Sequence, residues 1–184
     1  MKRILAVVFV LFLFGCSTAE YTEPAIELRQ RLLSGRNCLF DCIVTADYGD
    51  KLYTFSMKCE ADQNGKVSFI VSEPDTIRGI SGNMSAQGGA ITFDDQVLAF
   101  PMLADGQVAP IGAPFLLIKT LRSGYIRSCG KDDRFWKIQI DDSYEEKSLQ
   151  LDIWLDEHLA PIRCDILYAG RRYLVVDIEN FVIQ

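Results

Sequence analysis

Alternation of apolar and polar residues over long stretches constrains the fold of this chain most. Every second residue from Cys38 to Ala46 is apolar, and the same pattern recurs from Tyr53 to Ala61. A strand with this period has one face against a core and one largely polar face, as in an antiparallel sheet that is covered on one side. Asn64-Gly65 is a strong signal for a hairpin turn. The chain is therefore expected to build a one-sided antiparallel sheet.

Two helices interrupt this pattern. Pro24 suits the first turn of a helix that ends at Ser34-Gly35. Pro114 is expected to begin a second helix, which Gly124 can end. The apolar side of the first helix is expected to consist of Ile26, Leu28, Leu32 and Leu33.

The rest of the chain is predicted to form further strands and one long loop. The segment 101–114 contains three prolines and two glycines and is expected to be a loop. We count about eleven strands in total and one α+β domain over 24–184. The strands after the first two are expected near 67–71, 76–84, 90–94, 97–101, 124–129, 134–141, 148–156, 161–168 and 171–182.

The first sixteen residues have the pattern of an export signal. Met1-Lys2-Arg3 is cationic, and an apolar run of eleven residues follows from Ile4 to Phe14. A helix needs about twenty residues to span a bilayer, so this run is expected to be the core of a cleaved signal peptide. The ending Leu13-Phe14-Gly15-Cys16 resembles the lipobox of bacterial lipoproteins. That resemblance implies a signal peptide over 1–15, acylation of Cys16 and a polar tether over 16–23.

Charge and anchor together define the expected surroundings of the protein. The net charge is −6, and loss of the two positive charges on Lys2 and Arg3 with the signal leaves −8. Nucleic-acid-binding proteins need a cationic surface, so nucleic acid is excluded as a partner. Acyl chains on Cys16 are expected to hold the protein on a membrane. We therefore expect an extracytoplasmic protein, anchored to the cell membrane if the host is Gram-positive.

Five cysteines follow Cys16, and an odd number on an exported chain cannot pair completely within it. The three that share apolar strand faces are Cys38, Cys42 and Cys59, and the others are Cys129 and Cys164. We favour packed core thiols, because free cysteine behaves as a small apolar side chain. A cross-strand disulfide between Cys42 and Cys59 and a thiolate metal site are the alternatives.

No pattern of catalytic or cofactor-binding residues is present in the sequence. The single histidine, His158, lies in a predicted hairpin turn, where a solvated side chain is the favoured interpretation. Gly79-Ile80-Ser81-Gly82 and Gly88-Gly89 follow no buried parallel strand and begin no helix, so they do not match a phosphate-binding loop. We expect no enzyme activity, no cofactor and no metal.

The order of the elements resembles the LolA/LolB lipoprotein-carrier fold over residues 24–184. The most similar stretch is LQLDIWLDEHLAPIRCDILYAGRRYLVVDIENFVI, at 149–183. The resemblance implies a curved, mostly antiparallel half-barrel of about eleven strands, with two helices covering its open side. Within this group, FLLIKTLRSGYIRSCG and IDDSYEEKSLQLDIWLDE are most similar to lipoproteins of spore-forming clostridia, including a germination lipoprotein that partners a cortex amidase.

Two functions follow from this resemblance. The favoured one is a membrane-anchored, non-catalytic lipoprotein that recruits or regulates a protein partner, such as a cell-wall or spore-cortex enzyme. The alternative is a carrier or receptor that binds acyl chains or lipoproteins in an apolar half-barrel cavity. In the alternative, helix 114–123 is a lid, and otherwise it is core. Its candidate ligand-binding residues are Phe115, Leu116, Leu117, Ile118 and Leu121.

Overall fold

The computed structural model describes residues 22–93, 96–100, 103–104, 107–145 and 148–184. The signal sequence, Cys16 and most of the predicted tether lie outside these residues. The two predicted helices are α2 (Glu23–Ser34) and α3 (Ala113–Ser123). Short 3-10 helices are η2 (Asp75–Ile77) and η3 (Pro110–Gly112).

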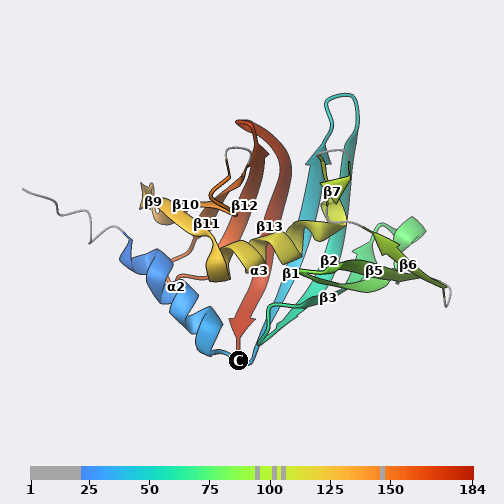
Figure 1. The fold of residues 1–184 in the computed structure, drawn as a ribbon, viewed down its shortest axis with the longest axis horizontal. Helices are drawn as coiled ribbons and strands as arrows, with labels where there is room; N and C mark the ends of the chain where they lie inside the picture. The colour runs from blue at the N-terminus through green and yellow to red at the C-terminus, as the bar shows by residue number, and fades with distance from the viewer. Residues whose placement is uncertain (1–21, 94–95, 101–102, 105–106, 146–147) are drawn as a thin grey trace, which may run out of the picture.

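One antiparallel sheet of eleven strands forms the body of the protein, in the order β6-β5-β4-β3-β2-β1-β13-β12-β11-β10-β9. The sheet is strongly curved and open, and α3 lies across its concave face (Figure 1). The predicted half-barrel with two helices over its open side is thereby confirmed. Its strands are β1 (Asn37–Asp47), β2 (Leu52–Asp62), β3 (Val67–Glu73), β4 (Ser81–Ser85), β5 (Gly88–Phe93), β6 (Gln96–Phe100), β9 (Tyr125–Asp132), β10 (Phe135–Asp141), β11 (Leu149–Leu155), β12 (Pro161–Tyr168) and β13 (Arg171–Ile183).

The position of α3 follows from the topology of the sheet. Strand β6 is at one edge and β9, the next strand of the sheet along the chain, is at the other. The connecting segment therefore has to cross the whole concave face. It does so through the two-residue strands β7 (Leu103–Ala104) and β8 (Gln107–Val108), then η3 and α3. The predicted loop over 101–114 thus contains a small two-stranded ribbon and a 3-10 turn.

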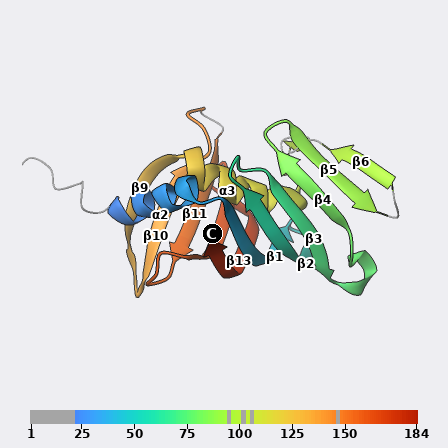
Figure 2. The ribbon, with the colours of Figure 1, turned by 90° about the horizontal axis from the view of Figure 1, so that it is seen from below.

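The core lies between the concave face and the helices. Alternate residues of β1, from Cys38 to Ala46, are buried, as the period-two pattern predicts. The inward residues of β11, β12 and β13 continue the same apolar layer under α3. The strands β4, β5 and β6 extend away from the two helices (Figure 2). Burial of this one face accounts for the stability of a sheet that is covered on one side.

Two local predictions were wrong. The segment predicted as strand from residue 76 is a 3-10 turn followed by Gly79, and β4 begins only at Ser81. Two backbone hydrogen bonds of Val71 close the loop that contains this 3-10 turn. The Val71 carbonyl accepts the Gly79 N–H at 2.9 Å, and the Val71 N–H donates to the Ile80 carbonyl. On α2, Ile26 and Leu33 are 45% and 54% exposed, because the helix lies beside the sheet and buries only one narrow stripe.

The turn glycines meet two different requirements. Gly65 has a φ of +80° in the β2–β3 hairpin turn, which glycine adopts without steric cost. Gly124 ends α3 in an extended conformation with a φ of −69°. A Cβ there would lie 2.6 Å from Cγ2 of Ile140 and 2.7 Å from Cγ2 of Thr120. Close packing of the helix end against β10, and not a left-handed conformation, therefore explains glycine at position 124.

Candidate functional site

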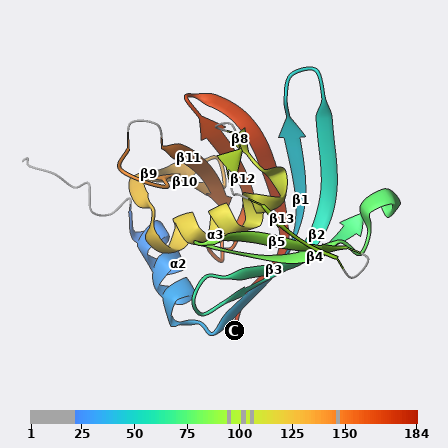
Figure 3. The same cartoon turned by 45° about the vertical axis from the view of Figure 1, so that its right-hand side comes forward.

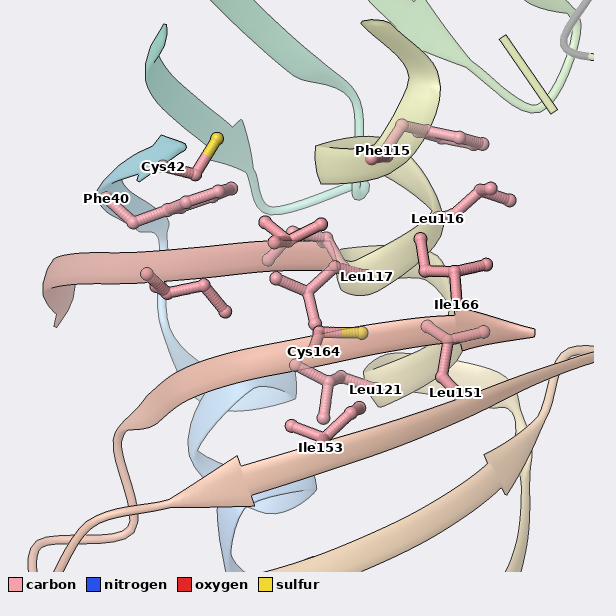
Figure 4. Packing of buried hydrophobic residues seen from close by; sticks show 14 of the residues in the cluster. Phe40, Cys42, Phe115, Leu116, Leu117, Leu121, Leu151, Ile153, Cys164 and Ile166 are labelled. Atoms are coloured by element: carbon pink, nitrogen blue, oxygen red, sulfur yellow. The ribbon is translucent and has the colours of Figure 1, made fainter. Parts of the chain in front are cut away.

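The helix α3 is the candidate site, and its five predicted residues are all buried. The exposed fractions of Leu117 and Ile118 are 0% and 1%, and those of the other three do not exceed 5%. Leu117 and Leu121 lie among Leu151, Ile153, Cys164 and Ile166 of the sheet (Figure 4). In this structure the apolar side of α3 therefore forms part of the core.

Two arginines link α2 and α3 through hydrogen bonds to backbone carbonyls. Arg29 of α2 donates hydrogen bonds from Nε to the Leu121 carbonyl and from Nη2 to the Gly124 carbonyl, both at 2.7 Å. Arg122 of α3 donates in return to the Leu32 carbonyl of α2 at 2.8 Å, and to the Gln63 carbonyl of the β2–β3 turn at 2.7 Å. We call this reciprocal pair, Arg29 and Arg122, the arginine clasp.

Electrostatic attraction favours the contact between each guanidinium group of the arginine clasp and carbonyls near the end of a helix. The last carbonyls of a helix have no partner within the helix and carry partial negative charge. A guanidinium group offers several N–H donors in a fixed plane, so it can bind more than one of these carbonyls. Burial lowers the pKa of Arg29, while Tyr144 acts in the opposite direction. No sequence pattern predicts the clasp, because each arginine binds backbone carbonyls about ninety residues away along the chain.

We expect Arg29→Ala to destabilise the protein by roughly 1.5–3 kcal/mol, the usual range for hydrogen bonds to charged groups. The loss leaves the carbonyls at the C-terminal end of α3 without this donor. Denaturant unfolding of the purified protein measures the change. Arg36→Ala is the matched control, because Arg36 is exposed, and it should change the free energy of unfolding by less than about 0.5 kcal/mol. Equal effects of the two variants would contradict a structural role for the clasp.

An open groove of about 680 Å³ runs beside the outer side of α3. Of the five predicted ligand-binding residues, only Phe115 lines it. The other lining residues are mostly polar or charged and come from α2, α3 and the turns that connect β2 to β3 and β4 to β5: Leu33, Asp62, Asn64, Gly65, Lys66, Asn83, Ser85, Ala86, Gln87, Lys119, Arg122 and Ser123. The groove is thus a mixed polar surface and not an apolar channel.

The five cysteines of the folded part are buried free thiols, as we favoured. The Cys42 and Cys59 sulfur atoms are 3.8 Å apart, which is contact distance and well beyond the length of a disulfide bond. Burial raises the pKa of Cys38 to about 12 and raises that of Cys164 strongly. Thiolate is the reactive form, so these groups are poor nucleophiles. Among the residues with described positions, no three His, Cys, Asp or Glu side chains are grouped to hold a metal ion.

Two buried carboxylates lie on the convex face, and both have structural partners. Asp152 accepts hydrogen bonds from Gln139 and Gln150, and its carboxylate is 2.8 Å from Nζ of Lys137. Burial alone would raise the pKa of Asp152, but these three partners outweigh it and hold the pKa below its ordinary value. The second carboxylate, Asp165, is paired with Arg163 and Arg172 at 3.0 and 2.9 Å. Because its pKa is lowered, the Asp152 carboxylate is poorly suited to donate a proton near neutral pH.

His158 lies in the turn between β11 and β12, and its side chain is 81% exposed. Its backbone makes two hydrogen bonds: the carbonyl accepts one from Arg31 at 2.9 Å, and the N–H donates one to Asp156. The predicted solvated turn histidine is confirmed.

We therefore expect His158→Ala to change the free energy of unfolding by less than about 0.5 kcal/mol, since alanine keeps both backbone bonds. Thermal melts of the two proteins test the stability, and complementation of a deletion strain tests the function. A folded variant that fails to complement would point to chemistry at this turn.

Comparison with known proteins gives only remote likenesses. No protein-family model and no curated protein matches the chain. Among solved structures, a LolA superfamily protein from Nitrosomonas europaea has a TM-score of 0.49 at 9% identity, over 87% of this chain and 93% of that one. A putative outer membrane lipoprotein-sorting protein domain from Vibrio parahaemolyticus has 0.47 at 12%, over 91% and 94%. The lipoprotein LppX from Mycobacterium tuberculosis has 0.38 at 10%, over 85% and 92%. Likenesses this remote transfer no residue role to this chain.

Proposed function

We propose that this protein is an exported, lipid-anchored binding protein without a catalytic centre, which recruits or regulates a protein partner such as a cell-wall or spore-cortex enzyme. The observation that carries this proposal is the position of α3. Its apolar residues pack against the concave face, so an apolar ligand that bound beneath α3 would have to displace the helix from its core contacts. Contacts with another molecule then fall to the outer surface, where Leu52 and Tyr53 are 68% and 49% exposed.

The anchoring part of the proposal rests on the sequence before α2. Cys16 stands a few residues ahead of the start of this helix, which packs against α3 and lies near β9. Acylation at Cys16 would hold residues 24–184 close to a membrane surface and leave the hairpin ends of the sheet free for a partner. Among the described residues, no helix is long and apolar enough to cross a membrane.

Affinity capture tests the proposal. The tagged, lipidated protein is cross-linked in its host, purified in detergent and analysed by mass spectrometry for both protein and lipid. We expect one protein to be enriched reproducibly in stoichiometric amount. Enrichment of a lipid or acyl chain without any protein would contradict partner recruitment and support a carrier.

The carrier remains a second candidate, because the arginine clasp holds the ends of the two helices through hydrogen bonds alone. If the clasp opened, α3 could lift and expose the face that carries Phe115, Leu116, Leu117, Ile118 and Leu121. These residues would then line an apolar cavity for an acyl chain. Saturable binding of a fluorescent fatty acid by the wild-type protein would support this candidate, and its absence would remove it.

A further inference from the structure

Three tyrosines and two cations meet at one end of the sheet, on elements other than the candidate helix α3. The β1–β2 turn provides Tyr48 and Lys51, the start of β2 provides Tyr53, and the start of β13 provides Arg171 and Tyr173. Strand β1 pairs with both β2 and β13, which places Ala46 opposite Tyr53 on one side and Leu174 on the other. The β1–β2 hairpin projects at this end, beside the turn that leads into β13 (Figure 3). These five residues line an open pocket of about 320 Å³, which we call the tyrosine pocket.

The tyrosine pocket is held in shape by its own contacts. The rings of Tyr48 and Tyr53 meet edge to face, with centroids 6.1 Å apart. The guanidinium carbon of Arg171 lies 5.1 Å from the centroid of the Tyr173 ring, a cation–π distance. The Tyr48 N–H donates to the Lys51 carbonyl at 3.0 Å, which fixes the turn. A partner would therefore meet aromatic faces that are already positioned, which lowers the entropic cost of binding.

The charge of the tyrosine pocket is opposite to that of the chain as a whole. Neither Lys51 nor Arg171 forms an ion pair with any residue of known position in this structure, whereas the neighbouring Arg172 is paired with Asp165. The chain has a net charge of −6, whereas the five residues that line the pocket include two cations and no carboxylate. Such a site attracts and orients a negatively charged group.

We propose that the tyrosine pocket binds an acidic segment of a protein partner, with carboxylates on Lys51 and Arg171 and apolar side chains against Tyr53. Tyrosine and arginine are the residues over-represented at energetically dominant positions of protein interfaces. Tyr53 is 49% exposed, so it offers an aromatic contact that a free anion would not use. This inference rests on the proposed partner-binding function and names the surface and the chemistry of that partner.

Fluorescence anisotropy with a labelled decaglutamate peptide tests the inference on the lipidated protein in detergent at low salt, with decalysine as the matched probe. We expect saturable binding of decaglutamate alone. The double variant Lys51→Glu/Arg171→Glu should weaken it at least about tenfold, which is roughly 1.4 kcal/mol, and Tyr53→Ala should weaken it measurably. The matched control Lys58→Glu/Lys66→Glu makes the same change in charge at exposed lysines outside the pocket and should alter binding less than about twofold.

Equal losses in the two double variants, or no saturable binding by the wild type, would overturn the inference. Thermal melts of both variants verify that they are folded. Binding measurements with the protein identified by affinity capture distinguish failure of the tyrosine pocket from failure of the proposed partner-binding function. A captured protein that still binds the Lys51→Glu/Arg171→Glu variant contradicts the tyrosine pocket but leaves the partner-binding function intact, whereas failure to capture any protein contradicts that function itself.

Discussion

Leu117→Asp is expected to unfold the protein. The Leu117 side chain has no exposed area and lies among inward residues of the sheet. Loss of a buried leucine costs about 2–5 kcal/mol in itself, and the aspartate adds an unpaired carboxylate in an apolar core. The sum is comparable with the whole stability of a typical domain, about 5–15 kcal/mol. Circular dichroism and thermal melts should show loss of the cooperative transition at room temperature or a large fall in its midpoint.

The matched control is Leu33→Asp on α2. It makes the same chemical change at a leucine that is 54% exposed, and the protein should keep a cooperative melt close to that of the wild type. A displaceable hydrophobic dye is measured beside the melts. If Leu117→Asp kept an intact melt but lost dye binding, α3 would be a lid over a cavity, and the carrier would replace the partner-binding proposal.

Cys16→Ser is expected to abolish lipid attachment. The thioether bond to the diacylglyceryl group needs the cysteine sulfur, and a serine hydroxyl does not replace it. We expect no incorporation of labelled fatty acid, an uncut precursor of higher mass and loss of the processed form from the membrane fraction. Labelled palmitate followed by electrophoresis and membrane fractionation measures all three. Ser17→Ala changes the neighbouring residue and should leave labelling unchanged. Undiminished labelling of Cys16→Ser would place the anchor elsewhere and contradict the proposed signal.

The sequence predicted those parts of the fold that depend on local pattern. The alternation from Cys38 to Ala46 identified the inward face of β1, and Pro114 and Gly124 bounded α3 within one residue. Pattern did not predict the outward positions of Ile26 and Leu33, because which side of a helix is buried depends on what lies beside it. The loop that contains η2 was not predicted either, because the hydrogen bonds that close it are made by the backbone of Val71 and do not depend on a residue type.

The candidate site was predicted only in part. The apolar stripe of α3 identified the helix, yet the same stripe suits both a core helix and a lid, and only burial in the folded protein distinguishes them. The arginine clasp could not be found by spacing, because a guanidinium group that binds backbone carbonyls requires no particular residue type from its partner. Nor does the sequence bring Arg171 near Tyr48, since the pairing of β1 with β13 joins segments more than 120 residues apart.

That pairing also has a consequence for how the chain folds. The strands β1 to β6 and β9 to β13 form two meanders of neighbouring strands, each of which can assemble from local contacts as it is synthesised. The two meanders become one sheet only when β13 pairs with β1. This pairing brings together segments at opposite ends of the folded domain. Such a high contact order slows folding. The edge of β1 therefore stays open until β13 has been synthesised, so the nascent chain depends on this last strand of the sheet for protection against aggregation.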